Sequence, residues 1–114
     1  MNLIIVTACL AGVAHSKMCA NALKKEAEAR GHRVLVEMQG GTNLSDTIPA
    51  EVCKKADIVL IAYAISIAKK ERFEGLPIIK VPIDQAIRNI KAVIDEVERV
   101  YITKKDKSHE HTGE

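Results

Sequence analysis

Four short runs of apolar residues recur along the chain, and each predicts a β-strand. The runs cover residues 3–6, 34–38, 58–62 and 78–81. They are apolar at nearly every position instead of alternating with polar residues, which is typical of strands buried on both faces of a parallel sheet. The segments between the runs then supply the helices and loops that cover such a sheet.

The segment 17–30 has the periodicity of an amphipathic helix. Its apolar positions at helical spacing are Met18, Ala22, Leu23 and Ala27. Ser16 is the predicted N-cap of this helix. Gly31 is the predicted residue just past its end, where glycine most easily adopts a left-handed backbone conformation.

Later segments also predict helices. Pro49 can open a short helix that runs to residue 55, since proline is tolerated in a first turn. One helical turn is expected before Phe73. Asp84 is a candidate cap for a final helix. The apolar stripe of that helix consists of Ile87, Ile90, Val93 or Ile94, Val97 and Tyr101.

The order of these elements, β-α-β-α-β-(α)-β-α, predicts the fold. Alternation of this kind indicates a mainly parallel sheet with right-handed crossovers and helices on both faces. We therefore expect an α/β fold, a three-layer α/β/α sandwich with a four-stranded parallel sheet, in one domain over residues 1–102. The tail 103–114 is polar and has no apolar period, so its composition predicts disorder.

The composition narrows the classes of function. A formal net charge of +2 and 3% aromatic residues provide neither the basic field nor the stacking side chains that nucleic-acid binding needs. No apolar run approaches the roughly 20 residues that span a bilayer, so no direct membrane insertion is expected. Three cysteines without a CxxC pair and an N-terminus unlike a signal peptide indicate a reduced, cytoplasmic setting.

The candidate site is the loop that follows the first strand. In open α/β sheets, ligands bind at the carboxyl ends of the strands, and the first strand here leads directly to Cys9. The next helix would direct its unpaired N–H groups at this loop, a field that binds anions and favours a thiolate. We predict that Cys9 is the nucleophile. The phosphate-binding residues around it are Leu10, Ala11, Gly12, Val13, Ala14, His15 and Ser16.

A cysteine in such a loop fits either hydrolysis or relay of a phosphoryl group. The spacing of Cys9, His15 and Ser16 matches that of a cysteine phosphatase. Histidine, however, stands where that enzyme has an arginine to clamp the phosphate. No Asp-Pro general-acid loop is present either, so the residues favour relay. Cys19 and Cys53 lie within predicted helices and are expected to be buried structural thiols.

No cofactor and no metal are expected. The chain contains neither the GxxxxGK(S/T) nucleotide loop nor a GxGxxG motif. His109 and His111 lie in the polar tail, where scattered histidines are more often simply solvated than bound to a metal.

Several motifs resemble the IIB components of the fructose-type sugar phosphotransferase system. Residues 6–16, VTACLAGVAHS, resemble the phosphocysteine loop of that family, whose usual form is VTACPTGIAHT. Residues 37–40 (EMQG), 56–59 (ADIV) and 71–75 (ERFEG) resemble its ETQG, AD and ERFxG elements. The resemblance covers roughly residues 2–100, and the motifs are specific when taken together.

This resemblance implies a function and its partners. A phosphohistidine on a IIA partner would donate its phosphoryl group to Cys9. The phosphocysteine would then pass the group to a sugar, fructose or fructose-like, bound in the membrane-embedded IIC partner during uptake. The family fold is a four-stranded parallel sheet flanked by helices. The protein would work in the cytoplasm, at the inner face of the membrane through its IIC partner.

Departures from the family pattern leave other functions open. Leu10 and Ala11 replace the usual Pro-Thr, which removes one hydroxyl and leaves more of the phosphate binding to backbone amides. Ala64 stands where the family commonly has an acidic residue. A small cysteine-dependent phosphatase and a non-catalytic regulatory module of the same fold are the alternatives.

Overall fold

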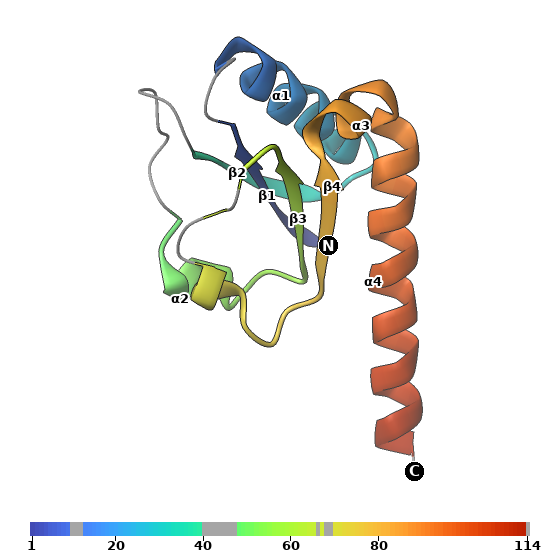
Figure 1. Ribbon diagram of the computed structural model, residues 1–114. Coiled ribbons are helices and arrows are strands. Elements are labelled where there is room, and N and C mark those ends of the chain that lie inside the picture. Colours follow the sequence, from blue (N-terminus) through green and yellow to red (C-terminus); the bar gives the residue numbers. More distant parts are fainter. Residues whose placement is uncertain (10–12, 40–47, 66, 68–69, 114) are drawn as a thin grey trace.

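A parallel β-sheet lies between two layers of helices (Figure 1). The computed structural model describes residues 1–9, 13–39, 48–65, 67 and 70–113, with the backbone alone for 13–16, 70 and 104–113. Within these residues the strands are β1 (Asn2–Ala8), β2 (Arg33–Gln39), β3 (Ile58–Tyr63) and β4 (Ile78–Pro82). All four predicted strands are confirmed, each longer than its apolar run by one to three residues.

The strand order determines where a ligand can bind. The four described strands lie in the order β2-β1-β3-β4 and every neighbouring pair is parallel. Ile5 of β1 is in register with Val36 on one side and Leu60 on the other. The chain moves from β1 outward to β2, then returns across β1 to β3 and β4. The topological switch point therefore lies between β1 and β3, and the predicted α/β fold is confirmed.

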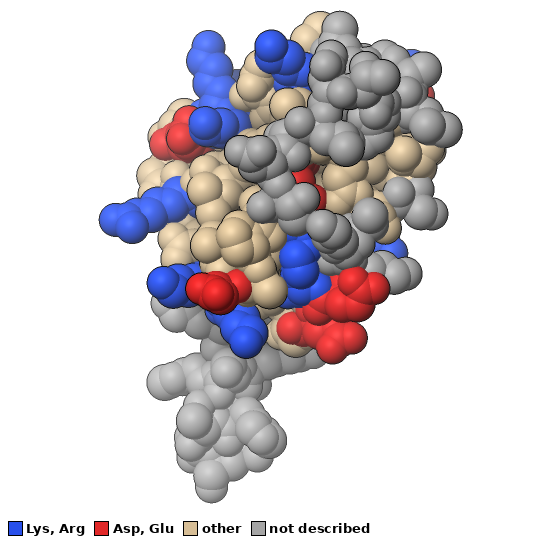
Figure 2. All heavy atoms as spheres, turned by 90° about the vertical axis from the view of Figure 1, so that its left-hand side faces the viewer, with Lys and Arg blue, Asp and Glu red and all other residues tan. Residues whose placement is uncertain are grey.

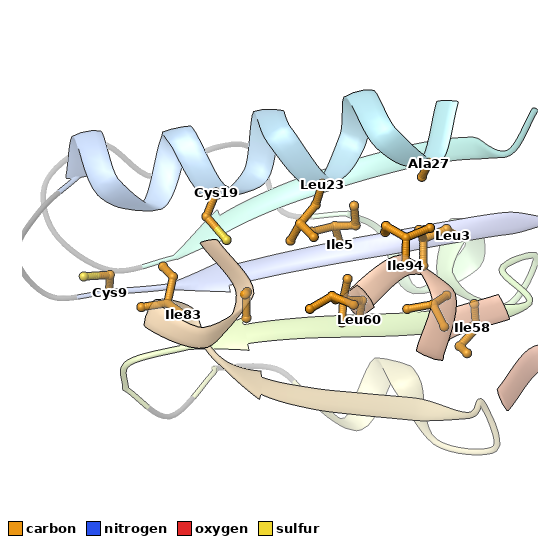
Figure 3. Packing of buried hydrophobic residues seen from close by; sticks show 14 residues of the cluster. Leu3, Ile5, Cys9, Cys19, Leu23, Ala27, Ile58, Leu60, Ile83 and Ile94 are labelled. Atoms are coloured by element: carbon orange, nitrogen blue, oxygen red, sulfur yellow. The ribbon is translucent and has the colours of Figure 1, made fainter. Parts of the chain in front are cut away.

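Each face of the sheet packs against its own set of helices. One face packs against α1 (Val13–Ala29), α3 (Ile83–Arg88) and α4 (Ile90–Gly113), and the other against α2 (Ala50–Cys53) and the 3-10 helix η1 (Lys70–Phe73). The first core includes Leu3, Ile5, Leu23, Ile58, Leu60 and Ile94 (Figure 3). The second includes Ile4, Val6, Cys53, Val59, Ile61 and Phe73. Most of the side chains in both cores are aliphatic because the strands present such residues on both faces.

Helix α1 begins earlier than its sequence predicts. It starts at Val13, so Ser16 lies inside the first turn and the prediction that it is the N-cap is wrong. At the other end, Gly31 has φ of 87°. The N–H of Gly31 donates to the Glu28 carbonyl (2.9 Å) and the N–H of His32 to the Ala27 carbonyl (3.1 Å). This pair of bonds is a Schellman cap, so the prediction for Gly31 is confirmed.

The predicted final helix is two helices. α3 ends at Arg88, Asn89 has φ of −133° and ψ of 47°, and α4 begins at Ile90. Pro82 is the N-cap of α3, so the prediction that Asp84 caps the helix is wrong. The predicted stripe is confirmed at its centre, where Val93, Ile94 and Val97 are buried.

Helix α4 continues to Gly113 and so includes most of the polar tail, where composition predicts disorder. Lysine and glutamate are good helix formers, and no proline interrupts this segment. The domain boundary at residue 102 stays a prediction. None of the described helices is long and apolar enough to cross a membrane.

Candidate functional site

Cys9 lies one residue beyond β1, at the carboxyl edge of the sheet and at its switch point. Figure 3 shows its side chain at that end of β1, near Ile83 and below the start of α1. The residue is 9% exposed and belongs to the same core cluster as Ile83 and Cys19. Cys9 is therefore at the border between the packed core and the loop that follows.

Two backbone hydrogen bonds fix the chain at this point. The N–H of Cys9 donates to the carbonyl of Gln39 on β2 (3.1 Å), and the N–H of Ala64 after β3 donates to the carbonyl of Ala8 (2.7 Å). The residue is thus held between the ends of both neighbouring strands. Parallel strands on either side leave its backbone little freedom.

The first turn of α1 follows Cys9 closely. Val13, Ala14, His15 and Ser16 form this turn, which contains no acidic residue. The first N–H groups of an α-helix have no partner within the helix, and they attract anions. The predicted phosphate-binding residues Leu10, Ala11 and Gly12 lie outside the described residues, and so do the side chains of residues 13–16. Phosphate binding by these seven residues stays a prediction.

The other two cysteines differ from Cys9. Cys19 in α1 and Cys53 in α2 are both fully buried, as predicted, and none of the three thiols forms a disulfide. Burial raises the pKa of Cys19 to about 11. Burial is also the main cause of the raised pKa of Cys53. Both thiols therefore stay protonated at neutral pH and are poor nucleophiles.

A buried ion pair lies on the opposite face of the sheet from Cys9. Glu37 of β2 is 2% exposed, and the Arg72 guanidinium of η1 donates to both of its carboxylate oxygens, at 2.7 and 2.9 Å. The Cζ atom of Arg72 also lies over the Phe73 ring, 4.7 Å from its centre. The paired fork of hydrogen bonds is the strongest geometry available to arginine and a carboxylate.

The surroundings of Glu37 keep it ionised. Burial alone would raise its pKa, but hydrogen bonds from Arg72, from Gln39 and from the Ile48 N–H outweigh burial and hold the pKa of Glu37 below its usual range. Hydrogen bonding to Glu37 also raises the pKa of Arg72. The pair is therefore charged on both sides at neutral pH.

The sequence pattern alone indicates that Glu37 needs a charged partner. Glu37 interrupts an otherwise apolar run that predicts a buried strand. A carboxylate buried in a sheet needs a cationic partner. The pattern does not say which of the 17 lysines and arginines that partner is, because Arg72 is distant in sequence and meets Glu37 only in the folded chain.

Within the described residues, no group of three or more His, Cys, Asp and Glu side chains is placed to hold a metal ion. The side chains of His109 and His111 lie outside that part. Basic and acidic side chains are interspersed on the face shown in Figure 2. Tyr63 and Ala64, at the end of β3, are exposed beside the Cys9 edge.

Fold, strand order and sequence together define the class of protein. Residues 4–96 match the family described as "PTS system, Lactose/Cellobiose specific IIB subunit". The chain belongs to this family of IIB components of the sugar phosphotransferase system (PTS).

Within the family, the similarities are to the fructose-like type. The chain is 41% identical over 97 residues to the PTS system fructose-like EIIB component 2 of Escherichia coli (strain K12), covering 85% of this chain and 92% of that one. It is 31% identical over 99 residues to the fructose-like PTS system EIIBC component of the same strain, covering 85% of this chain and 20% of that one.

A solved structure agrees with both the fold and the type. The crystal structure of a "Predicted Fructose Specific IIB" from Escherichia coli has a TM-score of 0.82 to this chain, at 32% sequence identity, and the match covers 88% of each. The family resemblance predicted from the motifs is therefore confirmed.

Proposed function

We propose that this protein is a phosphoryl carrier that receives phosphate on Cys9 and passes it to a sugar. The donor is a phosphohistidine of a IIA partner, and the acceptor is a hydroxyl of fructose or a fructose-like sugar held by a membrane IIC partner. The observation that carries the proposal is the place of Cys9, at the switch point of the sheet and before the first turn of α1.

The two transfers balance as substitutions at phosphorus. In the first, the Cys9 thiolate attacks the phosphorus, the S–P bond forms, and the N–P bond to the donor imidazole breaks. In the second, the sugar hydroxyl attacks, the O–P bond forms, and Cys9 leaves as a thiolate while the hydroxyl proton goes to a base. The N–H groups at the start of α1 support the added negative charge in both steps.

The sequence around Cys9 supports a carrier over a hydrolase. His15 stands where a cysteine phosphatase has an arginine that clamps the phosphate and supports the transition-state charge. Without that support, we expect the phosphocysteine to wait for its acceptor instead of being hydrolysed quickly.

We expect both phosphoryl transfers to take place in the cytoplasm, at the inner face of the membrane, because the IIC partner lies in the membrane. The EIIBC relative carries in its name both a B and a C component, which supports direct transfer between the two. The sugar would be selected in the membrane partner.

Relay and hydrolysis can be separated after the protein has been phosphorylated and the donor removed. We expect the phosphoryl group to remain on the protein for many minutes in buffer, and to leave within seconds when IIC membranes and fructose are added. Steady release of inorganic phosphate that depends on Cys9 but not on sugar would show a phosphatase instead.

A further inference from the structure

The proposed chemistry leaves the buried Glu37–Arg72 pair without a role. A buried ion pair is weak evidence for stability, because desolvation of the two charges costs about as much as their attraction returns. The Glu37 side chain is 2% exposed and that of Arg72 is 9% exposed. The contacts of the pair show which parts of the chain its fixed geometry holds in place.

The pair holds the chain on both sides of residues 40–47. Before this segment, the amide nitrogen of the Gln39 side chain donates to Glu37 Oε2 at 2.6 Å. After it, the N–H of Ile48 donates to Glu37 Oε1 at 2.7 Å, and Arg72 Nη1 donates to the Ile48 carbonyl at 2.7 Å. Both flanking residues are thus bonded to one rigid fork.

Gln39 connects this cluster to the site. Its side chain donates to Glu37, and its own backbone carbonyl accepts the N–H of Cys9 at 3.1 Å. Glu37 and Gln39 are two residues apart on β2, so their side chains lie on the same face of the strand. The contacts form an unbroken path from Arg72 through Glu37 and Gln39 to the backbone of Cys9.

We propose that Arg72, Glu37 and Gln39 are positioning residues for phosphoryl transfer at Cys9. They hold the end of β2 so that the Gln39 carbonyl stays bonded to the Cys9 N–H. This bond fixes the direction in which the Cys9 side chain leaves the strand. The inference rests on the proposed function of Cys9 as the phosphoryl acceptor.

The physical reason is that transfer between two proteins demands an aligned nucleophile. Misplacement of a reacting atom by about 1 Å can cost about a hundredfold in rate. The fork of two parallel N–H···O bonds fixes direction as well as distance, which a single-point lysine does not. Loosening this cluster should therefore change the orientation of Cys9.

The first test is Gln39→Leu, which cuts the path but keeps both members of the ion pair. Its rate of phosphoryl acceptance from a IIA donor should fall about tenfold or more. Hydrogen exchange at the Cys9 amide should become about tenfold faster, while exchange at the Leu60 amide in β3 stays unchanged. Arg72→Lys keeps the charge but loses the fork, and should fall between wild type and Gln39→Leu in both measurements.

Arg30→Met provides the matched control. Arg30 is also an arginine with several carboxylate partners, Glu26, Asp95 and Glu98, but it joins α1 to α4 instead of contacting the site. This variant should keep the wild-type acceptance rate per folded molecule and the wild-type exchange at Cys9.

The outcomes separate positioning from simple stability. The inference is overturned if Gln39→Leu keeps the wild-type rate and exchange at Cys9, or if its rate falls only in proportion to its unfolded fraction. A wild-type protein that takes no phosphate would overturn the proposed function and the role in transfer. Hydrogen exchange needs no partner, so it would still decide whether the cluster holds Cys9.

Discussion

The three thiols of this chain have different surroundings, and their reactivities should differ accordingly. Cys19 and Cys53 are fully buried with raised pKa values, whereas Cys9 borders a loop and is 9% exposed. We expect iodoacetamide at neutral pH to alkylate Cys9 and to leave the other two unmodified, as measured by peptide mass mapping. In denaturant all three should react. Labelling of Cys19 or Cys53 before Cys9 in the folded protein would contradict this assignment.

Glu37 makes the stability of the protein depend on pH. Its pKa is lowered in the folded state, below the value of about 4.3 for an unperturbed glutamate. The ionised side chain therefore stabilises the fold fully above about pH 4.3. This contribution is lost as the pH falls through the lower, folded pKa. Acid should thus weaken the wild type through this residue.

Glu37→Gln measures that contribution. The substitution leaves the buried Arg72 without its counter-charge and should cost about 3 kcal/mol at neutral pH. Urea unfolding as a function of pH should show the gap between wild type and variant narrowing below about pH 4.3. A gap that stays constant down to acid pH would show that Glu37 has the same pKa in the folded and the unfolded protein, which contradicts the lowered pKa.

At the scale of elements, the end of α1 depends on the left-handed conformation of Gly31. A Cβ added there would meet nothing within 4 Å, so the cost of a side chain comes from the backbone conformation alone. Gly31→Ala should lower the free energy of unfolding by about 1 kcal/mol. Gly31→Asn should cost less, because asparagine tolerates this region. The midpoints of urea unfolding, at unchanged slopes, measure the loss for each of the two variants. Equal midpoints for Gly31→Ala and the wild type would contradict the dependence of the helix end on Gly31.

The strands could be predicted from the sequence because their apolar runs are continuous. Helix boundaries could not be predicted as closely. The first helix starts at Val13 instead of near residue 17. This start cannot be predicted because Val13 and Ala14 carry no signal that distinguishes a loop from a first turn. The sequence does not predict the break at Asn89, because the apolar stripe continues through it from Ile87 to Ile90.

At the scale of the whole molecule, a polar cluster joins α4 to α1. Arg30 donates to Glu26, Asp95 and Glu98, and His32 contacts the second carboxylate oxygen of Glu98 at 2.6 Å. These bonds hold α4 against the end of α1 (Figure 1). The cluster lies at the edge of the helix layer, where the two helices meet outside the core.

Arg30→Met should weaken this contact without changing the site. Partly exposed ion pairs contribute little, so we expect a loss of about 1 kcal/mol at low salt, and a smaller loss at high salt because ions screen the pairs. Urea unfolding at two salt concentrations measures both values. A loss that is the same at both would show that packing of the arginine stem, and not charge, is what the variant removes.

The candidate site was predictable only in part. Cys9 could be identified because it follows a strand and precedes a glycine and a helix, all local features. Glu37, Gln39 and Arg72 were visible only as pieces of family motifs. Their hydrogen bonds connect residues up to 35 positions apart, and the periodicity of single elements contains no information on such contacts.

The central claim is that Cys9 accepts a phosphoryl group, and intact-mass measurement tests it directly. The protein is incubated with phosphoenolpyruvate, the general phosphotransferase proteins and a IIA protein, and then weighed. We predict that the wild type gains the mass of one phosphoryl group and that Cys9→Ser gains none, while Cys19→Ser behaves as the wild type. A wild type that gains no mass, or a Cys9→Ser variant that still gains it, would contradict the account.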